Sequence, residues 1–244
     1  DTDREARCPR TAVRGTSAPD EFLVYESGLG FFVRLGDGLQ TGLFLDQRDN
    51  RLRVQKLAGG LTMCNLFAYT GAFTVFAVAG GATRTVTVDV AAAPLQRARK
   101  NLDLLGASEK DHTLLDVDAL FWLKGAVKRG DKFDIVVLDP PSFATTKTST
   151  FSAKDDLGTV LSLALQITAE GGRLLAATNH RGISRQRLRR EVGRTRRQGG
   201  RGGGCYHSTA DQSNKNTSLH GFSLSDFAGA NGRRLPSLSL CKPS

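Results

Sequence analysis

Short apolar runs alternate with stretches of helical length through the middle of the chain. The apolar runs lie at residues 61–66, 85–88, 112–115, 133–138 and 173–177. The stretches between and after them, at 71–79, 91–105, 119–127, 154–167 and 184–192, have the spacing and length of helices. Strands separated by such helices form right-handed βαβ units. The pattern therefore predicts an α/β fold of the Rossmann-like type, a doubly wound and mostly parallel sheet with helices on both faces.

The first part of the chain has a different pattern. Residues 22–25 and 31–35 read as strands separated by a Ser-Gly-Leu-Gly turn, which predicts a β-hairpin. Residues 46–57 are charged and helical in character, and we expect Asp46 to cap that helix. Residues 1–20 are polar and do not have the apolar core of a signal peptide. We expect a flexible lead-in at 1–20, a hairpin segment and linker helix at 21–57, and the main domain at 58–193.

One uncharged stretch, residues 57–83, is long enough to cross a bilayer. It contains Asn65, Tyr69, Thr70 and five glycines, and its pattern changes from strand to helix halfway along. We therefore interpret it as buried core and not as a membrane span.

The regular pattern ends near Gly193. Residues 194–244 hold eight glycines and eight serines and show no sustained period, which is typical of a disordered tail. A complete doubly wound sheet would have two more strands here, and the sequence does not show them. Such an abrupt change also fits an altered reading frame or a non-native end, and the sequence leaves both interpretations open.

Composition changes this picture little. The formal net charge is +10, but residues 194–244 hold eight Lys/Arg and two Asp and so contribute +6, leaving +4 for the first 193 residues. The charge alone is weak evidence for a nucleic-acid partner. The cysteines, Cys8, Cys64, Cys205 and Cys241, are far apart and form no CxxC pair. We expect no metal site, no disulfide framework and a reducing, cytoplasmic setting.

Candidate chemistry lies where the predicted strands end, because ligands of open α/β sheets bind beyond those ends. The first strand runs into a turn at Gly71, where a helix begins and an anionic group would be favoured. The second ends at Asp89, 18 residues later, which suits hydrogen bonds to a ribose. Each has a plainer alternative: loop geometry for Gly71, and a helix cap for Asp89.

Two further strand ends carry acids. Asp116 follows the third strand and could accept from an adenine amino group, or could equally cap the next helix. Asp139, Pro140 and Pro141 follow the fourth strand and form a stiff extended turn. Phe143 comes two residues later and could stack on a base. The order of these features favours function over a simple strand end.

With these residues in view, the chain resembles the class I S-adenosylmethionine-dependent methyltransferases of large-subunit ribosomal RNA, the family of the bacterial 23S rRNA methyltransferases I and K/L. The resemblance covers residues 22–193 and is carried by three motifs: Gln40-Thr41-Gly42-Leu43-Phe44-Leu45-Asp46-Gln47-Arg48-Asp49-Asn50-Arg51, the 65–73 turn and the 139–143 turn. It implies an S-adenosylmethionine cofactor, an RNA partner such as 23S rRNA, and no membrane.

The resemblance also implies roles for individual residues. The methionine part of the cofactor would lie on the turn formed by residues 65–71. Asp89 would bind the ribose and Asp116 the adenine, and the Asp139-Pro140-Pro141 turn with Phe143 would lie between methyl donor and base. The implied cofactor-binding residues are Arg48, Asn65, Phe67, Tyr69, Gly71, Asp89 and Asp116. For Arg48, a place on the helix surface is an equal alternative.

The absence of a cysteine from the predicted site bears on which atom of the base is methylated. Methylation of cytosine at C5 needs a cysteine thiolate that attacks C6, and no cysteine occurs at 139–143 or at 177–182. Cys64 is expected to pack as a small apolar residue. The stretch 139–143, followed by Thr150-Phe151 and by Asn179-His180-Arg181, looks closer to the relatives that methylate guanine at N7. His180 could contact RNA or be an ordinary loop residue. A methyltransferase with another substrate, or an inactive fragment that binds cofactor or RNA, remains the alternative.

Overall fold

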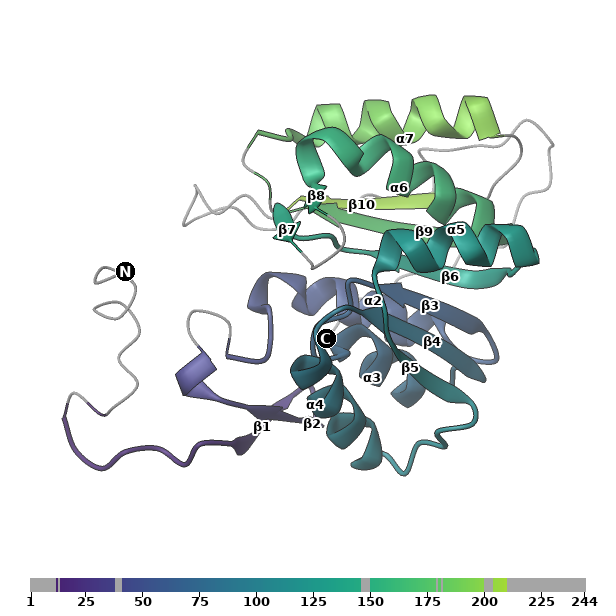
Figure 1. Ribbon diagram of the computed structural model, residues 1–244. Helices are drawn as coiled ribbons and strands as arrows, with labels where there is room; N and C mark the ends of the chain where they lie inside the picture. Colours follow the sequence, from purple (N-terminus) through teal and green to yellow (C-terminus); the bar gives the residue numbers. More distant parts are fainter. Residues whose placement is uncertain are drawn as a thin grey trace, which may run out of the picture. The chain divides into compact units, whose positions relative to one another are not determined.

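The computed structural model describes residues 12, 14–37, 41–145, 150–178, 180, 182–199 and 204–209 (Figure 1). All of them belong to one compact unit, Asp1–Asp211. Most of the expected lead-in, the residues after 209, and Gln40, Asn179 and Arg181 lie outside the described residues.

The main sheet has six strands in the order β10-β9-β6-β3-β4-β5, and every neighbouring pair is parallel. The order reverses between β3 and β6, which makes the sheet doubly wound, as the alternation of strands and helices predicted. The strands are β3 (Thr62–Leu66), β4 (Arg84–Asp89), β5 (His112–Asp116), β6 (Phe133–Leu138), β9 (Thr168–Thr178) and β10 (Gly204–Thr209).

Helices cover both faces of this sheet (Figure 1). Buried side chains of α5, α6 and α7 pack with Cys64 and Leu66 of β3 on one face. Side chains of α2 and α3 pack with Met63 of the same strand on the other face. Neighbouring residues of β3 thus point to opposite sides, as the period of a strand requires. The helices are α2 (Arg48–Leu57), α3 (Ala72–Ala79), α4 (Ala92–Asp103), α5 (Ala119–Arg129), α6 (Ala153–Ile167) and α7 (Arg185–Gly199).

The uncharged stretch at 57–83 supplies the central strand β3 and the helix α3, and both lie in the core. Among the described residues, no helix combines the length and apolar character needed to cross a bilayer.

A two-stranded antiparallel hairpin precedes this sheet, as the sequence predicted. It consists of β1 (Phe22–Glu26) and β2 (Leu29–Val33), with Glu26 opposite Leu29. Two short 3-10 helices, η1 (Leu35–Asp37) and η2 (Leu45–Gln47), follow it. The expectation that Asp46 caps the next helix was wrong: Gln47 is the N-cap of α2, and it makes no side-chain capping bond. Asp46 lies inside η2, which runs directly into α2, so it lacks the extended backbone of a capping residue.

The end of the domain also differs from expectation. We expected the last helix to end at 192 and no strand to follow, but α7 continues to Gly199 and β10 pairs with β9. The added part of α7 is rich in arginine, which favours helix although it gives no apolar period. The β10 segment, Gly-Cys-Tyr-His-Ser-Thr, lacks an apolar run. It is identified as a strand by its parallel pairing with β9, in which Gly204 pairs with Arg173 and Thr209 with Thr178.

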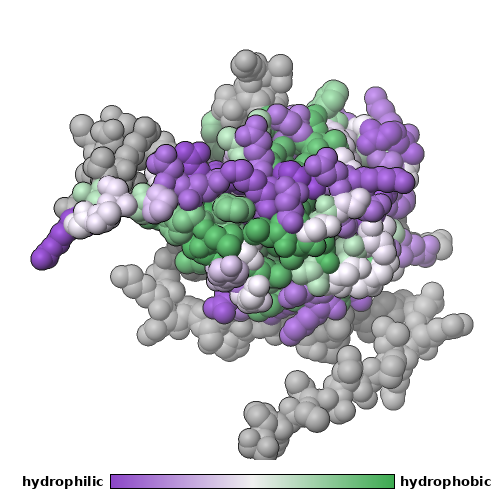
Figure 2. Space-filling model, turned by 90° about the horizontal axis from the view of Figure 1, so that it is seen from below, coloured by the Kyte–Doolittle hydropathy of each residue, from purple (hydrophilic) through white to green (hydrophobic). Residues whose placement is uncertain are grey.

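The hairpin packs against the end of α4. A Cβ atom on Gly30 would lie 3.0 Å from Cδ1 of Leu104, so the glycine leaves room for this leucine. Tyr25 and Leu104 remain exposed on these two elements. The face seen from below carries an apolar area bordered by a hydrophilic band (Figure 2).

Candidate active site and cofactor site

The four predicted strand-end features meet at one edge of the sheet. Because β3, β4, β5 and β6 are parallel and adjacent, their carboxyl ends lie together. The chain leaves β3 through the turn at residues 67–71, while β4 and β5 end at Asp89 and Asp116 and Asp139 follows β6. This edge includes the point between β3 and β6 where the strand order reverses, which is where open α/β sheets bind ligands.

The turn after β3 has an unusual backbone. Phe67, Tyr69 and Gly71 have φ values of +57°, +51° and +68°, whereas Ala68 and Thr70 between them do not have positive φ. Left-handed conformations cost a residue with a side chain about 1 kcal/mol or more. Hydrogen bonds hold this backbone: the N–H of Ala68 donates to the carbonyl of Val88, that of Tyr69 to Asp89 and that of Gly71 to the carbonyl of Ala68.

Gly71 is required at the end of this turn for a reason that the sequence did not show. A Cβ atom at this position would lie 2.8 Å from the Cβ of Ala98 in α4, closer than such atoms approach. Its φ of +68° also favours glycine. The glycine therefore lets α3 and α4 approach each other, and the expected approach of a ligand to its backbone stays a prediction.

Asp89 holds the same turn from the neighbouring strand. Its Oδ2 accepts a hydrogen bond of 2.7 Å from the backbone N–H of Tyr69, and its Oδ1 accepts one of 2.9 Å from Ala91. Burial raises the pKa of Asp89, and the hydrogen bonds from Ala91 and Tyr69 oppose that rise. The N-cap of α4 is Ala91, so the alternative of Asp89 as that cap was wrong.

Asp116 is exposed and lies opposite Asp89 in the β4–β5 register. It does not cap α5, because Asp118 does so by accepting a 2.8 Å hydrogen bond from the N–H of Phe121. The capping alternative for Asp116 was therefore wrong, because the N-cap lies two residues after the strand end.

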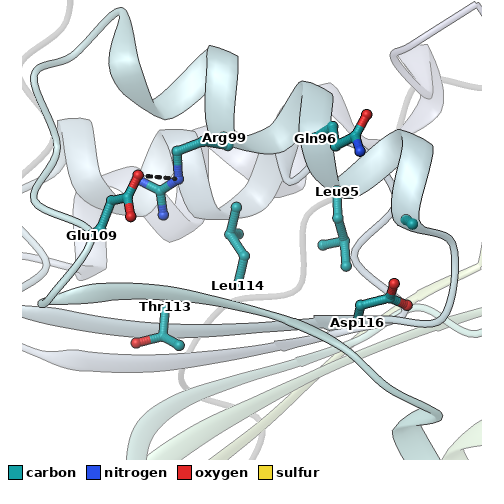
Figure 3. A pocket seen from close by; sticks show the side chains of 8 residues that line it. Leu95, Gln96, Arg99, Glu109, Thr113, Leu114 and Asp116 are labelled. Atoms are coloured by element: carbon teal, nitrogen blue, oxygen red, sulfur yellow. Dashed lines mark ion pairs between the residues drawn. The ribbon is translucent and has the colours of Figure 1, made fainter.

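Asp116 also lines a pocket of about 420 Å³ between α4 and β5 (Figure 3). Leu95 and Leu114 point into its middle, and the ion pair of Arg99 with Glu109 lies at the end far from Asp116. Neither Gly71 nor Asp139 lines this pocket, so it is distinct from the space around the β6 turn. The lining residues are Ala92, Leu95, Gln96, Arg99, Glu109, Thr113, Leu114 and Asp116.

Asp139 carries the strongest electrostatic perturbation in the predicted site. Burial raises its pKa to about 7, the negative charge of Asp46 adds to the rise, and the positive charge of Arg51 opposes it. A carboxyl group with a pKa near neutrality can bind or release a proton during a reaction. The sequence indicated Asp139 but not its two charged neighbours.

The residues after Asp139 separate into a buried and an exposed part. Pro140 is buried, and Phe143 is 63% exposed at the start of β7 (Phe143–Thr145), which pairs with β8 (Thr150–Ser152). The ring of Phe151 in β8 is buried and lies 5.2 Å from the ring of Phe67. Phe67 thus joins the two turns by packing, whereas Phe143 is open to solvent.

Two of the residues predicted to bind the cofactor differ in their surroundings. Asn65 is buried, and its Nδ2 donates a 3.0 Å hydrogen bond to Thr74, whose hydroxyl lies 2.8 Å from that of Thr87. This places Asn65 beneath the turn, where it joins β3 to α3. Arg48, in contrast, is exposed at the first position of α2.

Three residues later on the same helix lies Arg51, which sequence reasoning did not single out. Its side chain is 1% exposed and forms two hydrogen bonds with Glu26 of β1, Nε to Oε1 at 2.8 Å and Nη2 to Oε2 at 2.7 Å. Its Nη1 donates a 2.9 Å bond to the carbonyl of Phe44. A signal was present, because Arg51, Val54 and Ala58 have the i, i+3, i+7 spacing of a buried helix face.

The segment that carried the family resemblance is fastened to the turn after β3. The hydroxyl of Thr70 donates a 2.6 Å hydrogen bond to the carbonyl of Gly42. The rings of Phe44 and Tyr69 meet edge to face with their centroids 5.4 Å apart. A long, distinctive string therefore lies against the turn that is predicted to hold the cofactor.

Asn101 of α4 is a second residue that sequence reasoning missed. Its Oδ1 accepts a 2.8 Å hydrogen bond from the N–H of Phe32 in the hairpin, and its Nδ2 donates a 3.2 Å bond to the carbonyl of Thr70. One buried amide thus joins the hairpin, α4 and the turn. An asparagine inside an amphipathic helix has no sequence pattern that reveals such a role.

Three further groups limit the chemistry. Cys64 is fully buried, and burial raises the pKa of its thiol well above the usual value, so it has little thiolate to act as a nucleophile. The backbone of Cys205 pairs with Leu174, four residues before the C-terminal end of β9. His180 accepts a 3.0 Å bond from the N–H of Gly182, as in a local loop. Within the described residues, no group of three or more His, Cys, Asp or Glu could hold a metal ion.

Comparison with known proteins adds a family to this geometry. Residues 10–198 match the family described as S-adenosylmethionine-dependent methyltransferase. The chain is 42% identical over 161 residues to the ribosomal RNA large subunit methyltransferase K/L of Methylococcus capsulatus, which covers 65% of the chain and 22% of that protein. It is 36% identical over 173 residues to the ribosomal RNA large subunit methyltransferase I of Aeromonas salmonicida, covering 70% of the chain and 44% of that protein.

Solved structures agree with the fold. The crystal structure of SMU.776 complexed with SAH matches with a TM-score of 0.71 and 34% identity, over 75% of this chain and 48% of that one. The chain spans less than half the length of each of these relatives.

Proposed function

The chain belongs to the family of S-adenosylmethionine-dependent methyltransferases, and from this we propose that it methylates a base of large-subunit ribosomal RNA, with a guanine nitrogen favoured over cytosine C5. The observation that carries the proposal is the meeting of the 67–71 turn, Asp89 and Asp139 at the switch point of the sheet. The names of the relatives of this chain support an RNA of the large ribosomal subunit as substrate.

The residues at this edge fit the charge pattern of the cofactor. When bound, S-adenosylmethionine supplies an electrophilic methyl group on a positively charged sulfur. The turn at Phe67, Tyr69 and Gly71 leads into the N-terminus of α3, and a helix N-terminus suits the carboxylate of the methionine part. Asp89 and Asp116 end adjacent strands and would accept hydrogen bonds from the ribose and the adenine. Asn65 would support the turn through its hydrogen bond to Thr74 of α3. Arg48, exposed at the start of α2, stays a candidate for binding the cofactor.

Asp139, Pro140 and Pro141 would hold the target base. The buried Pro140 fixes the backbone of this turn, and the exposed ring of Phe143 offers a surface on which a base can stack. The carboxyl group of Asp139 would accept a hydrogen bond from an N–H of the base, and its pKa of about 7 suits such a contact near neutral pH. Positioning of this kind is the main requirement for methyl transfer to nitrogen.

Cytosine C5 is disfavoured because no thiolate is available at this edge among the described residues. Cys64 is buried within β3, and Cys205 lies in the first half of β10. Methylation at C5 requires a covalent bond from such a thiolate to C6 of the base. A ring or exocyclic nitrogen carries its own lone pair and needs no such attack.

The proposal is tested with ribosomal RNA that lacks the modification. Purified chain, labelled S-adenosylmethionine and this RNA should give labelled nucleosides that mass spectrometry identifies by base and atom. Asp139→Ala should reduce labelling about 100-fold or more, while Asp103→Ala on the far end of α4 should not. A product on another RNA would change the substrate, and cofactor binding in calorimetry without any labelled product would indicate an inactive fragment.

A further inference from the structure

The buried ion pair of Arg51 and Glu26 lies between the hairpin and the predicted site of methyl transfer. Glu26 is the last residue of β1 and Arg51 lies in the second turn of α2, and both side chains are buried. A buried ion pair is costly to form and gives weak support for stability by itself. Stability alone therefore does not explain this pair, and we look for a role in function.

The third hydrogen bond of Arg51 points to that explanation. Nη1 donates to the carbonyl of Phe44, which immediately precedes η2. The ring of Phe44 meets the ring of Tyr69 in the turn after β3. The guanidinium group thus fixes the start of η2, which carries Asp46, while its planar fork is held in place by Glu26.

Asp139 follows the strand on which α2 packs, because Val54 of α2 and Val137 of β6 belong to one buried cluster. Asp46 of η2 and Arg51 of α2 act on its carboxyl group with opposite signs. Glu26 of β1 partly neutralises Arg51, and Asp89 at the end of β4 is engaged by backbone N–H groups of Tyr69 and Ala91. On the β9 side, His180 is bonded to Gly182.

We propose that Arg51 is a positioning residue for methyl transfer: held by Glu26, it fixes the η2 turn that carries Asp46 and so links the hairpin to the active-site carboxyl group of Asp139. This rests on the proposed role of Asp139. Three carboxylates and one guanidinium then form a single electrostatic unit that spans β1, η2, α2 and the β6 turn.

The unit predicts opposite effects for different substitutions. Arg51→Met removes the positive charge and should raise the titration midpoint of Asp139 by about one pH unit. Asp46→Asn removes the like charge and should lower the midpoint by a similar amount. Glu26→Gln leaves Arg51 less neutralised and should also lower it, while keeping a side chain of nearly the same shape.

Arg53→Met serves as the matched control. Arg53 lies on the same helix, is exposed, and loses the same charge on substitution. It should leave the midpoint unchanged, which separates a local effect of Arg51 from the general loss of one positive charge.

The decisive experiment follows the Asp139 carboxyl carbon by NMR in protein labelled with ¹³C at aspartate Cγ, with Asp139→Asn to assign the signal. The pH profile of methyl transfer is measured on the same variants. A purely structural role for Arg51 would lower the melting temperature without moving either midpoint, and that result would overturn the proposal. If Arg51→Met does not fold, the proposal is tested by Glu26→Gln and Asp46→Asn, which should both lower the titration midpoint of Asp139. Unchanged midpoints in these two variants would also overturn the proposal.

Failure of the proposed function gives a different result. If the NMR midpoints shift as expected while the wild-type chain methylates no RNA, the electrostatic unit stands and the assigned reaction is wrong. If RNA is methylated while Asp139 titrates identically in all variants, the reaction stands and the role of Arg51 is wrong.

Discussion

The Oδ2 of Asp89 accepts a 2.7 Å hydrogen bond from the backbone N–H of Tyr69, so the acidic end of β4 is bonded directly to the turn that ends β3. The carboxylate thereby stabilises a left-handed residue whose φ is +51°. The same oxygen atoms retain lone pairs for further donors. One side chain can therefore shape the turn and contact a ligand at once.

Asp89→Asn should weaken binding of S-adenosylmethionine by about 10-fold or more, because a charged acceptor of backbone N–H groups is replaced by a neutral one. Isothermal titration calorimetry measures this directly. Asp103→Asn, a substitution of the same type at the exposed end of α4, should leave the affinity unchanged. Equal affinity in wild type and Asp89→Asn would remove Asp89 from the cofactor site.

Gly71→Ala should destabilise the fold by about 2–4 kcal/mol, because strain at positive φ adds to a clash with Ala98. Gly106 provides the control, since its φ is +64° and a Cβ atom placed there would meet no other atom within 4 Å. Gly106→Ala should therefore cost only the backbone strain, about 1 kcal/mol. Urea denaturation measures both.

The clash at Gly71 can be tested separately by adding Ala98→Gly to Gly71→Ala. The second substitution removes the atom that the new Cβ would meet, so part of the lost stability should return. Purely additive destabilisation in the double variant would contradict close packing of α3 on α4 as the reason for Gly71.

Asp139→Asn should make stability less dependent on pH. The pKa of Asp139 is about 7 in the folded protein against an ordinary value of 3.8, so the folded state binds more protons than the unfolded state between these values. Stability of the wild type therefore falls as pH rises through this window, and the loss is complete above pH 7. The variant should gain about 1–3 kcal/mol relative to wild type at pH 8 and nothing at pH 4. Denaturation at several pH values checks this, and a constant difference would contradict the raised pKa.

Cys64→Ala should retain methyl transfer per folded molecule, because the thiol is buried in β3 and carries a raised pKa. A modest loss of stability, about 1 kcal/mol, is expected from the smaller side chain. RNA that contains 5-fluorocytosine offers a second test, since it traps a thiolate nucleophile. A trapped adduct that disappears in Cys64→Ala would restore the C5 route.

Phe143→Ala should weaken RNA binding by about 10-fold while leaving cofactor binding intact, as expected when one base loses an aromatic surface. Tyr25→Ala is the control, because Tyr25 is 71% exposed against 63% for Phe143 but lies on the hairpin. Filter binding at fixed salt compares the two. Equal losses would show that exposed aromatic residues act here without positional specificity.

The sequence predicted the fold because β3, β4, β5 and β6 are short apolar runs whose period is read directly. It also predicted the strand-end acids, since parallel strands bring successive C-terminal ends to one edge. Contacts between distant segments were not predictable in this way. Glu26 with Arg51 and Phe32 with Asn101 are separated by 25 and 69 positions, and no local period relates them.

The prediction for the end of the domain, which lacked β10, was wrong for a different reason. The strand β10 has few apolar residues, and its position depends on backbone pairing with β9, which a search for apolar runs does not detect. The capping roles expected for Asp46, Asp89 and Asp116 were wrong because the N-caps of these helices lie one or two residues after the acids. Helix boundaries depend on backbone angles that single residues indicate only weakly.

The amide of Asn101 has a consequence for how this chain can be divided. It bonds to Phe32 in the hairpin and to Thr70 in the turn, so hydrogen bonds cross the change of sequence pattern near residue 57. Chimeras that exchange the hairpin segment between relatives would need to transfer Glu26 together with Arg51 and to retain an asparagine at position 101. Recombination near residue 57 would otherwise join two segments that cannot form the Glu26–Arg51 ion pair or the hydrogen bond between Phe32 and Asn101.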